Sequence, residues 1–256
     1  MESPSVLIVG AGPTGLVLGL SLAKNGLSIR IIDKAPEWTP GSRGSALMPR
    51  SLEAHHFLGT YEDIARSGLS TGSIVKRMYT VGSTHENHTA PFESADASDA
   101  TPIVDGILIG QDTQTKLLRS HLAKHGVHVE WGTELRSFKQ RPDYVDVQLV
   151  KTFNGEERPE ETRFLYVVGT DGARSVVRKE LGLTFLGETR ASDDMVVGDI
   201  YIEEGEGVID SKACATVNIM EHMAYLLTFY GRLCTFGEGQ GQNCELKVCI
   251  QLSSQC

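Results

Sequence analysis

The sequence predicts an α/β fold, and three observations support it. The apolar run 6–9 leads through a glycine-rich turn into an apolar helical stretch. A second predicted strand, 27–32, ends on the acidic residue Asp33. A third run, 164–168, again leads through a turn into a helical stretch. Strands that are apolar throughout are typical of a sheet buried on both faces, as in parallel α/β proteins.

The first strand leads directly into the pattern G-x-G-x-x-G, which is followed by the predicted helix 16–24. Gly10 allows a tight turn, Gly12 lets the backbone approach a pyrophosphate, and Gly15 lets the helix pack on the strand. The helix presents its positive end and free N–H groups to that diphosphate. The residues between the glycines belong to the same predicted binding loop: Ala11, Pro13 and Thr14.

Asp33 ends the second strand, 18 residues beyond Gly15. An acid at this place accepts hydrogen bonds from the ribose hydroxyls of an adenine dinucleotide. It would repel a 2′-phosphate, so the site favours FAD or NAD over NADP. Lys34 follows it and belongs to the same predicted site. Strand, glycines, helix, strand and acid together form a Rossmann-like βαβ unit, which predicts dinucleotide binding but leaves open which dinucleotide.

Composition and charge exclude several other classes. The 256 residues are 40% hydrophobic and 22% charged, close to the globular average, which argues against disorder, collagen and coiled coil. A net charge of −9 without a basic run provides no surface for nucleic acid. No apolar run reaches the roughly 18 residues that cross a bilayer. Glu2 and Gly10 argue against a signal peptide, and we expect a cytoplasmic protein.

Histidines and cysteines do not predict a metal site. All five cysteines lie in the last 43 residues: Cys214, Cys234, Cys244, Cys249 and Cys256. Their odd number and the missing secretory signal argue against disulfides. They form no C-x-x-C pair, and only His222 is nearby, so we expect no structural zinc. His121 and His125 lie four residues apart, but no carboxylate completes an H-E-x-x-H pattern.

A short-chain dehydrogenase is the first alternative at this length. Its chemistry needs a Tyr and a Lys four residues apart on a helix, so that the ammonium lowers the pKa of the phenol. None of the seven tyrosines is followed by lysine at that distance. This alternative is therefore excluded, whereas other nicotinamide dehydrogenases stay compatible with the glycine motif.

Two further segments narrow the choice. Residues 41–53 read Gly-Ser-Arg-Gly-Ser-Ala-Leu-Met-Pro-Arg-Ser-Leu-Glu, and residues 166–178 read Tyr-Val-Val-Gly-Thr-Asp-Gly-Ala-Arg-Ser-Val-Val-Arg. Together with the opening glycines they resemble the class A FAD-dependent aromatic hydroxylases, the para-hydroxybenzoate hydroxylase and phenol hydroxylase group. The resemblance extends over roughly residues 5–212, and its most specific element is the Asp-Gly pair. It implies that the bound dinucleotide is FAD.

The resemblance also implies roles for single residues. The glycines 10, 12 and 15 match the diphosphate loop, and Asp33 matches the acid on the adenosine ribose. Arg43 matches an arginine beside the FAD pyrophosphate, where a guanidinium can donate two hydrogen bonds to phosphate oxygens. The alternative interpretation of Arg43 is an exposed arginine in a flexible loop.

The remaining matches lie further along the chain. Gln111, at the start of the predicted helix 111–125, matches a residue that contacts the flavin. Asp171 and Gly172 match the Asp-Gly pair, which is implicated in binding both FAD and NAD(P)H. For Gln111 and Asp171 a simple role at the start of a helix stays open.

The activity is implied in the same way. In the family NAD(P)H reduces FAD, the reduced flavin captures O₂, and the resulting C4a-hydroperoxide transfers OH to an aromatic small molecule, phenolic or polyketide-like. The flavin carries this chemistry, while the protein positions it and excludes water. We assign no catalytic side chain, because substrate deprotonation falls to residues that vary in the family. NADH and NADPH both stay open as reductant, and homodimers are common in the family.

The family inserts a mainly β substrate domain into the FAD-binding domain. We expect residues 1–74 and 101–187 to form the FAD-binding domain, and 75–100 and 188–212 an incomplete substrate domain. Residues 213–256 read as an atypical tail. Within this frame the patterns predict strands at 127–131, 137–139 and 144–151, a hairpin through Asn154-Gly155 to 162–168, a strand at 195–202 and a helix at 173–181.

One family motif is missing, namely Gly-Asp-Ala-Ala-His followed by Pro. The one Gly-Asp pair, Gly198-Asp199, lies too early and in a strand-like context, so we interpret it as a coincidence. We therefore hypothesise that the 256 residues are a truncated product. Two functions stay open: an FAD-dependent monooxygenase, and a catalytically impaired FAD- or nucleotide-binding remnant with a binding or regulatory role.

Overall fold

The computed structural model describes residues 5–38, 44, 46–73, 75–79, 86–91, 96–153, 155–187, 216–220 and 223–227. The chain divides into two compact units, which we describe separately. The first unit consists of Met1–Pro40, Ala54–Ile64 and Gln111–Gly187. The second consists of Gly41–Glu53, Ala65–Gly110 and Glu188–Cys256.

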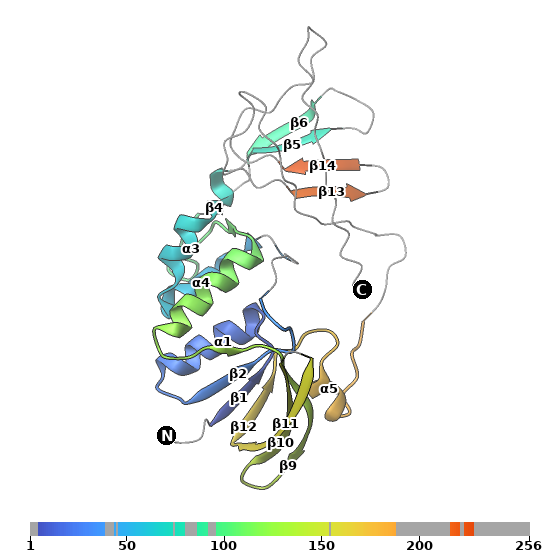
Figure 1. Cartoon of the computed structure of the whole chain (residues 1–256). Helices are drawn as coiled ribbons and strands as arrows, with labels where there is room; N and C mark the ends of the chain where they lie inside the picture. The colour runs from blue at the N-terminus through green and yellow to red at the C-terminus, as the bar shows by residue number, and fades with distance from the viewer. Residues whose placement is uncertain are drawn as a thin grey trace. The chain divides into compact units, whose positions relative to one another are not determined.

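A four-stranded parallel sheet forms the centre of the first unit (Figure 1). Its strand order is β12-β1-β2-β8. The strands are β1 (Val6–Val9), β2 (Ile29–Ile32), β8 (Val129–Glu130) and β12 (Tyr166–Gly169). Because β1 runs parallel to both β2 and β12, the carboxyl ends of these strands meet at one edge of the sheet. The predicted α/β fold is confirmed.

Layers on both faces bury this sheet. Val6 and Ile8 pack with apolar side chains of α1 (Pro13–Lys24) and α4 (Gln111–Ala123). Leu7 and the last residue of β1 pack on the other side, against an antiparallel sheet. Figure 1 shows the two helices and the antiparallel sheet on opposite faces. This double burial explains why the first strand is apolar throughout instead of alternating.

The antiparallel sheet consists of β9 (Thr133–Gln140), β10 (Val145–Phe153) and β11 (Glu156–Phe164). Gly155, with φ of 80°, lies in the tight turn between β10 and β11, so the predicted hairpin is confirmed. The prediction of one strand over 162–168 is wrong. Leu165 separates β11 from β12, because the chain leaves the antiparallel hairpin there and enters the parallel sheet.

Helix ends differ from the predicted ones. Helix α1 begins at Pro13, inside the glycine motif, since proline lacks the N–H that would be unpaired in a first turn. It ends at Lys24, where Asn25 and Gly26 close it as predicted, and Gly26 has φ of 76°. Helix α4 begins at Gln111 as predicted. Of the predicted helix 173–181, only α5 (Val176–Glu180) forms, because the preceding residues build its amino-terminal cap.

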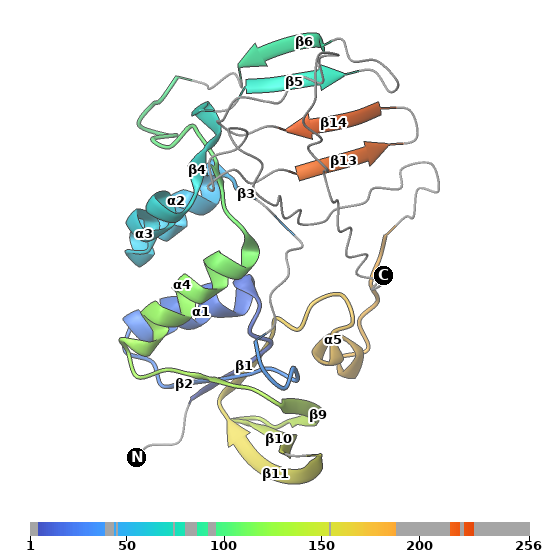
Figure 2. The same cartoon turned by 45° about the horizontal axis from the view of Figure 1, so that its top comes forward.

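The second unit contains short strands. The strands β3 (Ala46–Leu47), β7 (Ile107–Leu108) and β4 (Leu69–Ser70) form one sheet in that order. Two further antiparallel pairs of strands are shown in Figure 2. In one, β5 (Val75–Tyr79) pairs with β6 (Glu86–Pro91), and in the other, β13 (Thr216–Met220) pairs with β14 (Met223–Leu227). The 3₁₀ turn Thr71–Ser73 follows β4. The helices α2 (Pro49–Leu58) and α3 (Tyr61–Ser67) contain residues of both units.

The unit boundaries differ from the predicted domains, since 41–53, 65–74 and 101–110 fall in the second unit. The division into compact units does not show which ligand each unit binds, so the assignment of FAD and substrate domains stays a prediction. Arg43, the strand 195–202, Gly198-Asp199 and all five cysteines lie outside the described residues. No helix in the described part of the chain combines the length and apolarity needed to span a bilayer.

Candidate functional site

Two glycines of the motif are held in close backbone contact. Gly10 has φ of 105°, and a Cβ on it would lie 2.6 Å from the carbonyl oxygen of Thr170. A Cβ on Gly15 would lie 2.0 Å from the carbonyl oxygen of Gly10. Both distances are shorter than any contact that a real Cβ tolerates. The turn after β1 therefore closes tightly, and it brings the amino end of α1 close to the strand.

Gly12 is different, because a Cβ on it would meet no atom of the described residues within 4 Å. The open space lies directly before α1. The N–H of Leu16 donates to the carbonyl of Gly12 at 3.0 Å and is the first to bond in the helical ladder. The N–H groups of Thr14 and Gly15 precede that bond, as at every helix start. Space for an anion thus adjoins N–H donors at the positive end of α1.

Thr170 fixes the glycine turn, and the sequence patterns did not single it out. Its N–H donates to the carbonyl of Val9 at 2.8 Å. Its Oγ1 lies 2.9 Å from the same carbonyl oxygen and 2.8 Å from that of Gly10. The signal that could have found it is its place directly after the apolar run that ends β12. A hydroxyl there can reach the turn that follows the neighbouring strand.

Asp33 follows the carboxyl end of β2 and is half-buried. Its Oδ2 accepts a hydrogen bond from the N–H of Ala11 at 2.8 Å, and its Oδ1 accepts one from the N–H of Ala35 at 2.9 Å. Each carboxylate oxygen can accept more than one hydrogen bond, so capacity for ribose hydroxyls remains. Asp33 therefore positions the glycine turn, and its contact with the ribose stays a prediction. Lys34, beside it, is exposed.

Asp171 caps α5. Its Oδ2 accepts from the N–H of Val176 at 2.6 Å, and its Oδ1 accepts from Oγ of Ser175 at 2.6 Å. The Ser175 hydroxyl in turn accepts from the N–H of Arg178 at 3.0 Å. The capping role that the sequence left open is thus present in the structure. Gly172, with φ of 76°, is exposed beside it, and the cofactor role of this pair stays a prediction.

The structure brings most of the predicted residues to one edge of the parallel sheet. The glycine motif, Asp33 and the Asp171-Gly172 pair follow the carboxyl ends of β1, β2 and β12. In open α/β sheets, ligands bind outside this edge. Gln111 is half-buried as the first residue of α4, which packs on the same face of the sheet as α1.

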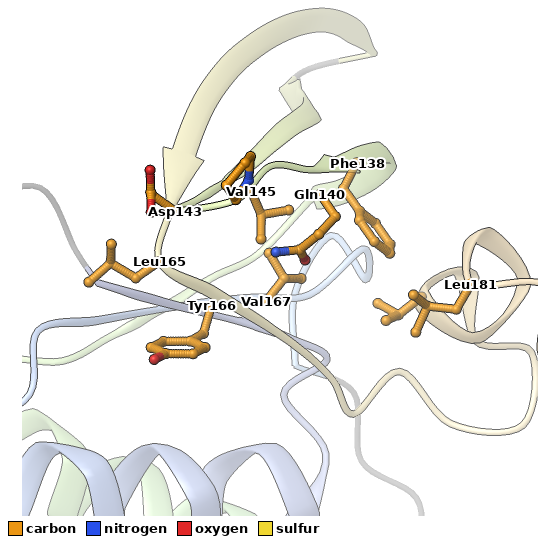
Figure 3. A pocket seen from close by; sticks show the side chains of 10 residues that line it. Phe138, Gln140, Asp143, Val145, Leu165, Tyr166, Val167 and Leu181 are labelled. Carbon is orange, nitrogen blue, oxygen red and sulfur yellow. The ribbon is translucent and has the colours of Figure 1, made fainter.

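A cavity of about 380 Å³ lies elsewhere in the first unit. Figure 3 shows that its lining comes from β9, β10, β12 and the end of α5. Leu165 and Tyr166, two of its lining residues, lie at the amino end of β12. The glycine turn follows the carboxyl ends of the strands, so we assign this cavity no role in binding a dinucleotide.

Among the described residues, no three His, Cys, Asp or Glu side chains gather as metal ligands would. His121 instead lies with its Nε2 at 2.7 Å from Oδ2 of Asp63. This contact joins α4 to α3. It explains the position of His121 as a packing contact between two helices.

Comparison with known proteins identifies the family. Residues 3–209 match the family model described as "FAD binding domain". The chain belongs to this FAD-binding family. The match includes the glycine motif, Asp33 and Asp171, and it agrees with the resemblance found in the sequence.

Curated relatives in this family are monooxygenases. A flavin-dependent monooxygenase of Mycobacteroides abscessus is 34% identical over 209 residues, which are 79% of this chain and 42% of that protein. A 6-methylpretetramide 4-monooxygenase of Streptomyces rimosus is 31% identical over 202 residues, 79% of this chain and 34% of that protein. The chain therefore spans less than half the length of these two relatives.

A solved structure supports the fold. The p-nitrophenol 4-monooxygenase PnpA from Pseudomonas putida DLL-E4 superposes with a TM-score of 0.67 over 93% of this chain and 60% of that one, at 24% identity. At this identity the likeness concerns the arrangement of the elements. It confirms the α/β fold with a second, β-containing part.

The residues present fit the FAD expected of the family. A side chain on Gly12 would occupy space that no atom of the described residues fills, as a backbone approached by a diphosphate requires. The adjoining N–H groups supply donors, and Asp33 retains acceptor capacity for the adenosine ribose. The crowding at Gly10 and Gly15 shows that the rest of the turn is closed, so the opening lies at one glycine.

Proposed function

We propose that this chain binds FAD and functions as a monooxygenase that uses NAD(P)H and O₂ to hydroxylate an aromatic small molecule. The observation that carries the proposal is the open space at Gly12, bounded by helix donors and flanked by Asp33. Similar proteins support the reaction class, since one is a 6-methylpretetramide 4-monooxygenase and the solved neighbour is a p-nitrophenol 4-monooxygenase.

The chain's own groups hold and orient the cofactor in this proposal. The N–H groups of Thr14 and Gly15 donate to the diphosphate, and the positive end of α1 favours its charge. Asp33 accepts hydrogen bonds from the ribose hydroxyls while it holds Ala11 in place. Arg43, Gln111 and Gly172 are the further proposed contacts.

Bound FAD supplies the redox chemistry, through which two electrons from NAD(P)H reduce O₂. One oxygen atom enters the ring as a hydroxyl group, and the other leaves as water. Thr170 acts indirectly, because it fixes the glycine turn. Asp171 orders α5 and is also a proposed contact of the cofactor.

The test begins with the colour and FAD content of the purified chain. We expect FAD to bind, and we expect NAD(P)H oxidation to increase when a phenol such as 4-nitrophenol is added under air. With ¹⁸O₂, the hydroxylated product should gain one labelled oxygen. Gly12→Val is the negative control. The valine side chain would fill the open space, so we expect this variant not to bind FAD.

Two outcomes separate the proposed functions. FAD binding without any NAD(P)H oxidation, over a panel of phenols and polycyclic aromatic phenols, would favour the non-catalytic nucleotide-binding role. Failure to bind FAD would contradict both the enzyme and the FAD-binding role of this chain.

A further inference from the structure

A buried histidine, His55, lies near the end of α2 and is 3% exposed. Its Nδ1 lies 2.8 Å from Oγ1 of Thr60, which follows the end of the helix. That hydroxyl donates its own proton to the carbonyl of His55 at 3.2 Å. Because a hydroxyl has one proton to give, Nδ1 carries the hydrogen of the shorter contact. The other ring nitrogen, Nε2, is therefore an acceptor in the neutral histidine.

The side-chain amide of Gln114 meets that acceptor. Nε2 of Gln114, on α4, lies 3.4 Å from Nε2 of His55. The contact is long for a hydrogen bond, but Gln114 is 7% exposed, so both side chains are shielded from water. Burial lowers the pKa of His55, which keeps the ring neutral and able to accept at pH 7. Shielded polar contacts with satisfied partners favour one arrangement of the elements that they join.

Gln114 lies one helical turn after Gln111, the proposed flavin contact at the start of α4. The two residues are three positions apart, so their side chains lie on the same side of the helix. The apolar anchors of α4 in the core, Leu118 and Leu122, come later in the helix. Those anchors hold the middle and the end of α4, whereas Gln114 joins its first turn to α2.

A second polar contact holds the same side of α4. Nε2 of His121 lies 2.7 Å from Oδ2 of Asp63 on α3. Gln114 and His121 are seven residues apart, which is close to two turns and about 10 Å along the axis. Two directional contacts at this spacing fix both the rotation of α4 and its position along its axis. All the residues of these two contacts belong to the first unit.

We propose that His55 is a positioning residue for the flavin, which accepts from Gln114 and thereby sets the first turn of α4 so that Gln111 reaches the flavin ring. The inference rests on the proposed binding of FAD. It adds to that site a buried side chain that acts through α4. The ADP half of FAD is assigned to the glycine turn and Asp33, so His55 should affect the binding of the flavin half alone.

Two amide variants separate this role from a role in the turn between α2 and α3. The amide of glutamine matches the Nε2 side of histidine, so His55→Gln retains an acceptor for Gln114 and loses the contact with Thr60. Asparagine is one methylene shorter and matches Nδ1 instead. His55→Asn therefore retains a donor for Thr60 and loses the contact with Gln114.

FAD and ADP affinities of the two variants, measured by calorimetry, are the first measurement. His55→Asn should weaken FAD about tenfold, an effect of the size expected for one lost buried polar contact. His55→Gln should keep FAD affinity within about twofold, and both variants should bind ADP like the wild type. The visible absorption of bound FAD should change in His55→Asn and not in His55→Gln. The matched control is His56→Asn, at the exposed neighbouring position, which should change none of these values.

A double variant tests the route through Gln111. Gln111→Ala should weaken FAD by itself, and adding His55→Asn should cause no further loss, because the contact that His55 positions is already absent. Urea unfolding checks that each variant is folded. Gln114→Met removes the same contact from the side of α4, so the test does not depend on the folding of His55→Asn. It should weaken FAD about tenfold and leave ADP affinity unchanged.

The outcomes distinguish the inference from the proposed function. Wild-type FAD affinity in folded His55→Asn and Gln114→Met would overturn the inference, and so would additive losses in the double variant. An equal loss of ADP and FAD affinity in these variants would assign His55 to the fold in general and would overturn it as well. A wild-type chain that does not bind FAD would instead contradict the proposed function itself.

Discussion

Gly12 and Gly15 occupy equivalent places in the sequence motif, yet a methyl group would meet different surroundings at each. At Gly15 it would collide with a backbone carbonyl that Thr170 also holds in place. At Gly12 it would enter open space. One glycine therefore serves the fold, and the other serves the approach of a ligand. The sequence motif has glycine at both positions and does not distinguish the two roles.

Substitution separates these two roles. Gly15→Ala should destabilise the chain by about 3 kcal/mol or more, since the clash is with backbone that cannot move aside. Gly12→Ala should change the free energy of unfolding by less than about 0.5 kcal/mol. It should nevertheless lower FAD affinity about tenfold, because the methyl group occupies the space before α1. Urea unfolding and FAD titration measure the two effects. Equal loss of stability in both variants would contradict this distinction.

At the scale of elements, α5 depends on its cap. It has five residues, so its own hydrogen bonds provide little stability. Asp171 and Ser175 together satisfy N–H groups of its first turn, and Val177 anchors it in the core. The Asp-Gly pair of the family motif is therefore also a structural element of this chain.

A graded set of variants distinguishes capping from cofactor binding. Asp171→Ala should cost about 2 kcal/mol of stability, because it leaves a backbone N–H and the Ser175 hydroxyl without their partner. Ser175→Ala should cost about 1 kcal/mol. Asp171→Asn keeps an acceptor and should retain most of the fold. If folded Asp171→Asn loses FAD affinity, the carboxylate acts on the cofactor; if its affinity is unchanged, the role of Asp171 is the cap.

A second element-level contact joins the two sheets of the first unit. Arg30 on β2 donates through Nε to Glu130 on β8 at 2.7 Å, and through Nη2 to Glu160 on β11 at 2.8 Å. The hydrogen bond from Arg30 is the main cause that lowers the pKa of Glu160. The pKa of Arg30 is raised in turn, chiefly by Glu160.

This network predicts an acid-sensitive contribution to stability. Because the folded pKa of Glu160 lies below its ordinary value of 4.5, its contribution is complete above that pH. It is lost as the pH falls through the folded pKa. Arg30→Met should lower stability at pH 7 by about 2 kcal/mol, since it leaves two half-buried carboxylates unpaired. It should also flatten the decline below pH 4.5. Thermal unfolding from pH 3 to 7 measures both, and an unchanged acid decline would contradict the assignment.

Sequence patterns predicted best those elements whose structure is determined within one short segment of the chain. The apolar strand β1, the glycine turn and the end of α1 before Asn25 and Gly26 follow from local rules and are confirmed. The division of 162–168 at Leu165 depends on which sheet each half joins, and local propensity does not contain that information. The contact of Thr170 with the glycine turn, and the stacking of Arg119 on Trp38 and Trp131, join segments distant in the chain, so no motif indicates them.

At the scale of the whole molecule, the proposed site lies mainly within one compact unit. The glycine turn, Asp33, Asp171 and Gln111 belong to the first unit, whereas Arg43 falls in the second. Proteins of two units need not unfold in one step. A ligand stabilises the state that binds it, by about 2.7 kcal/mol at a concentration of 100 times Kd. FAD should therefore stabilise the two units unequally.

Amide hydrogen exchange can measure the unequal stabilisation of the two units by FAD. Saturating FAD should slow the exchange of amides in β1, β2 and β12 by about 100-fold, the equivalent of 2.7 kcal/mol. The amides of β5 and β6, which contain none of the proposed contacts, should exchange at their original rate. Protection of β3, which begins three residues after Arg43, would support the proposed contact of that arginine with the diphosphate.

Gly12→Val is the control for this experiment. It should remove the protection from both units together, because the protecting contacts in either unit depend on a cofactor that no longer binds. Protection of β5 and β6 equal to that of β1 would show instead that the two units respond as one, and that the site is not confined as we propose.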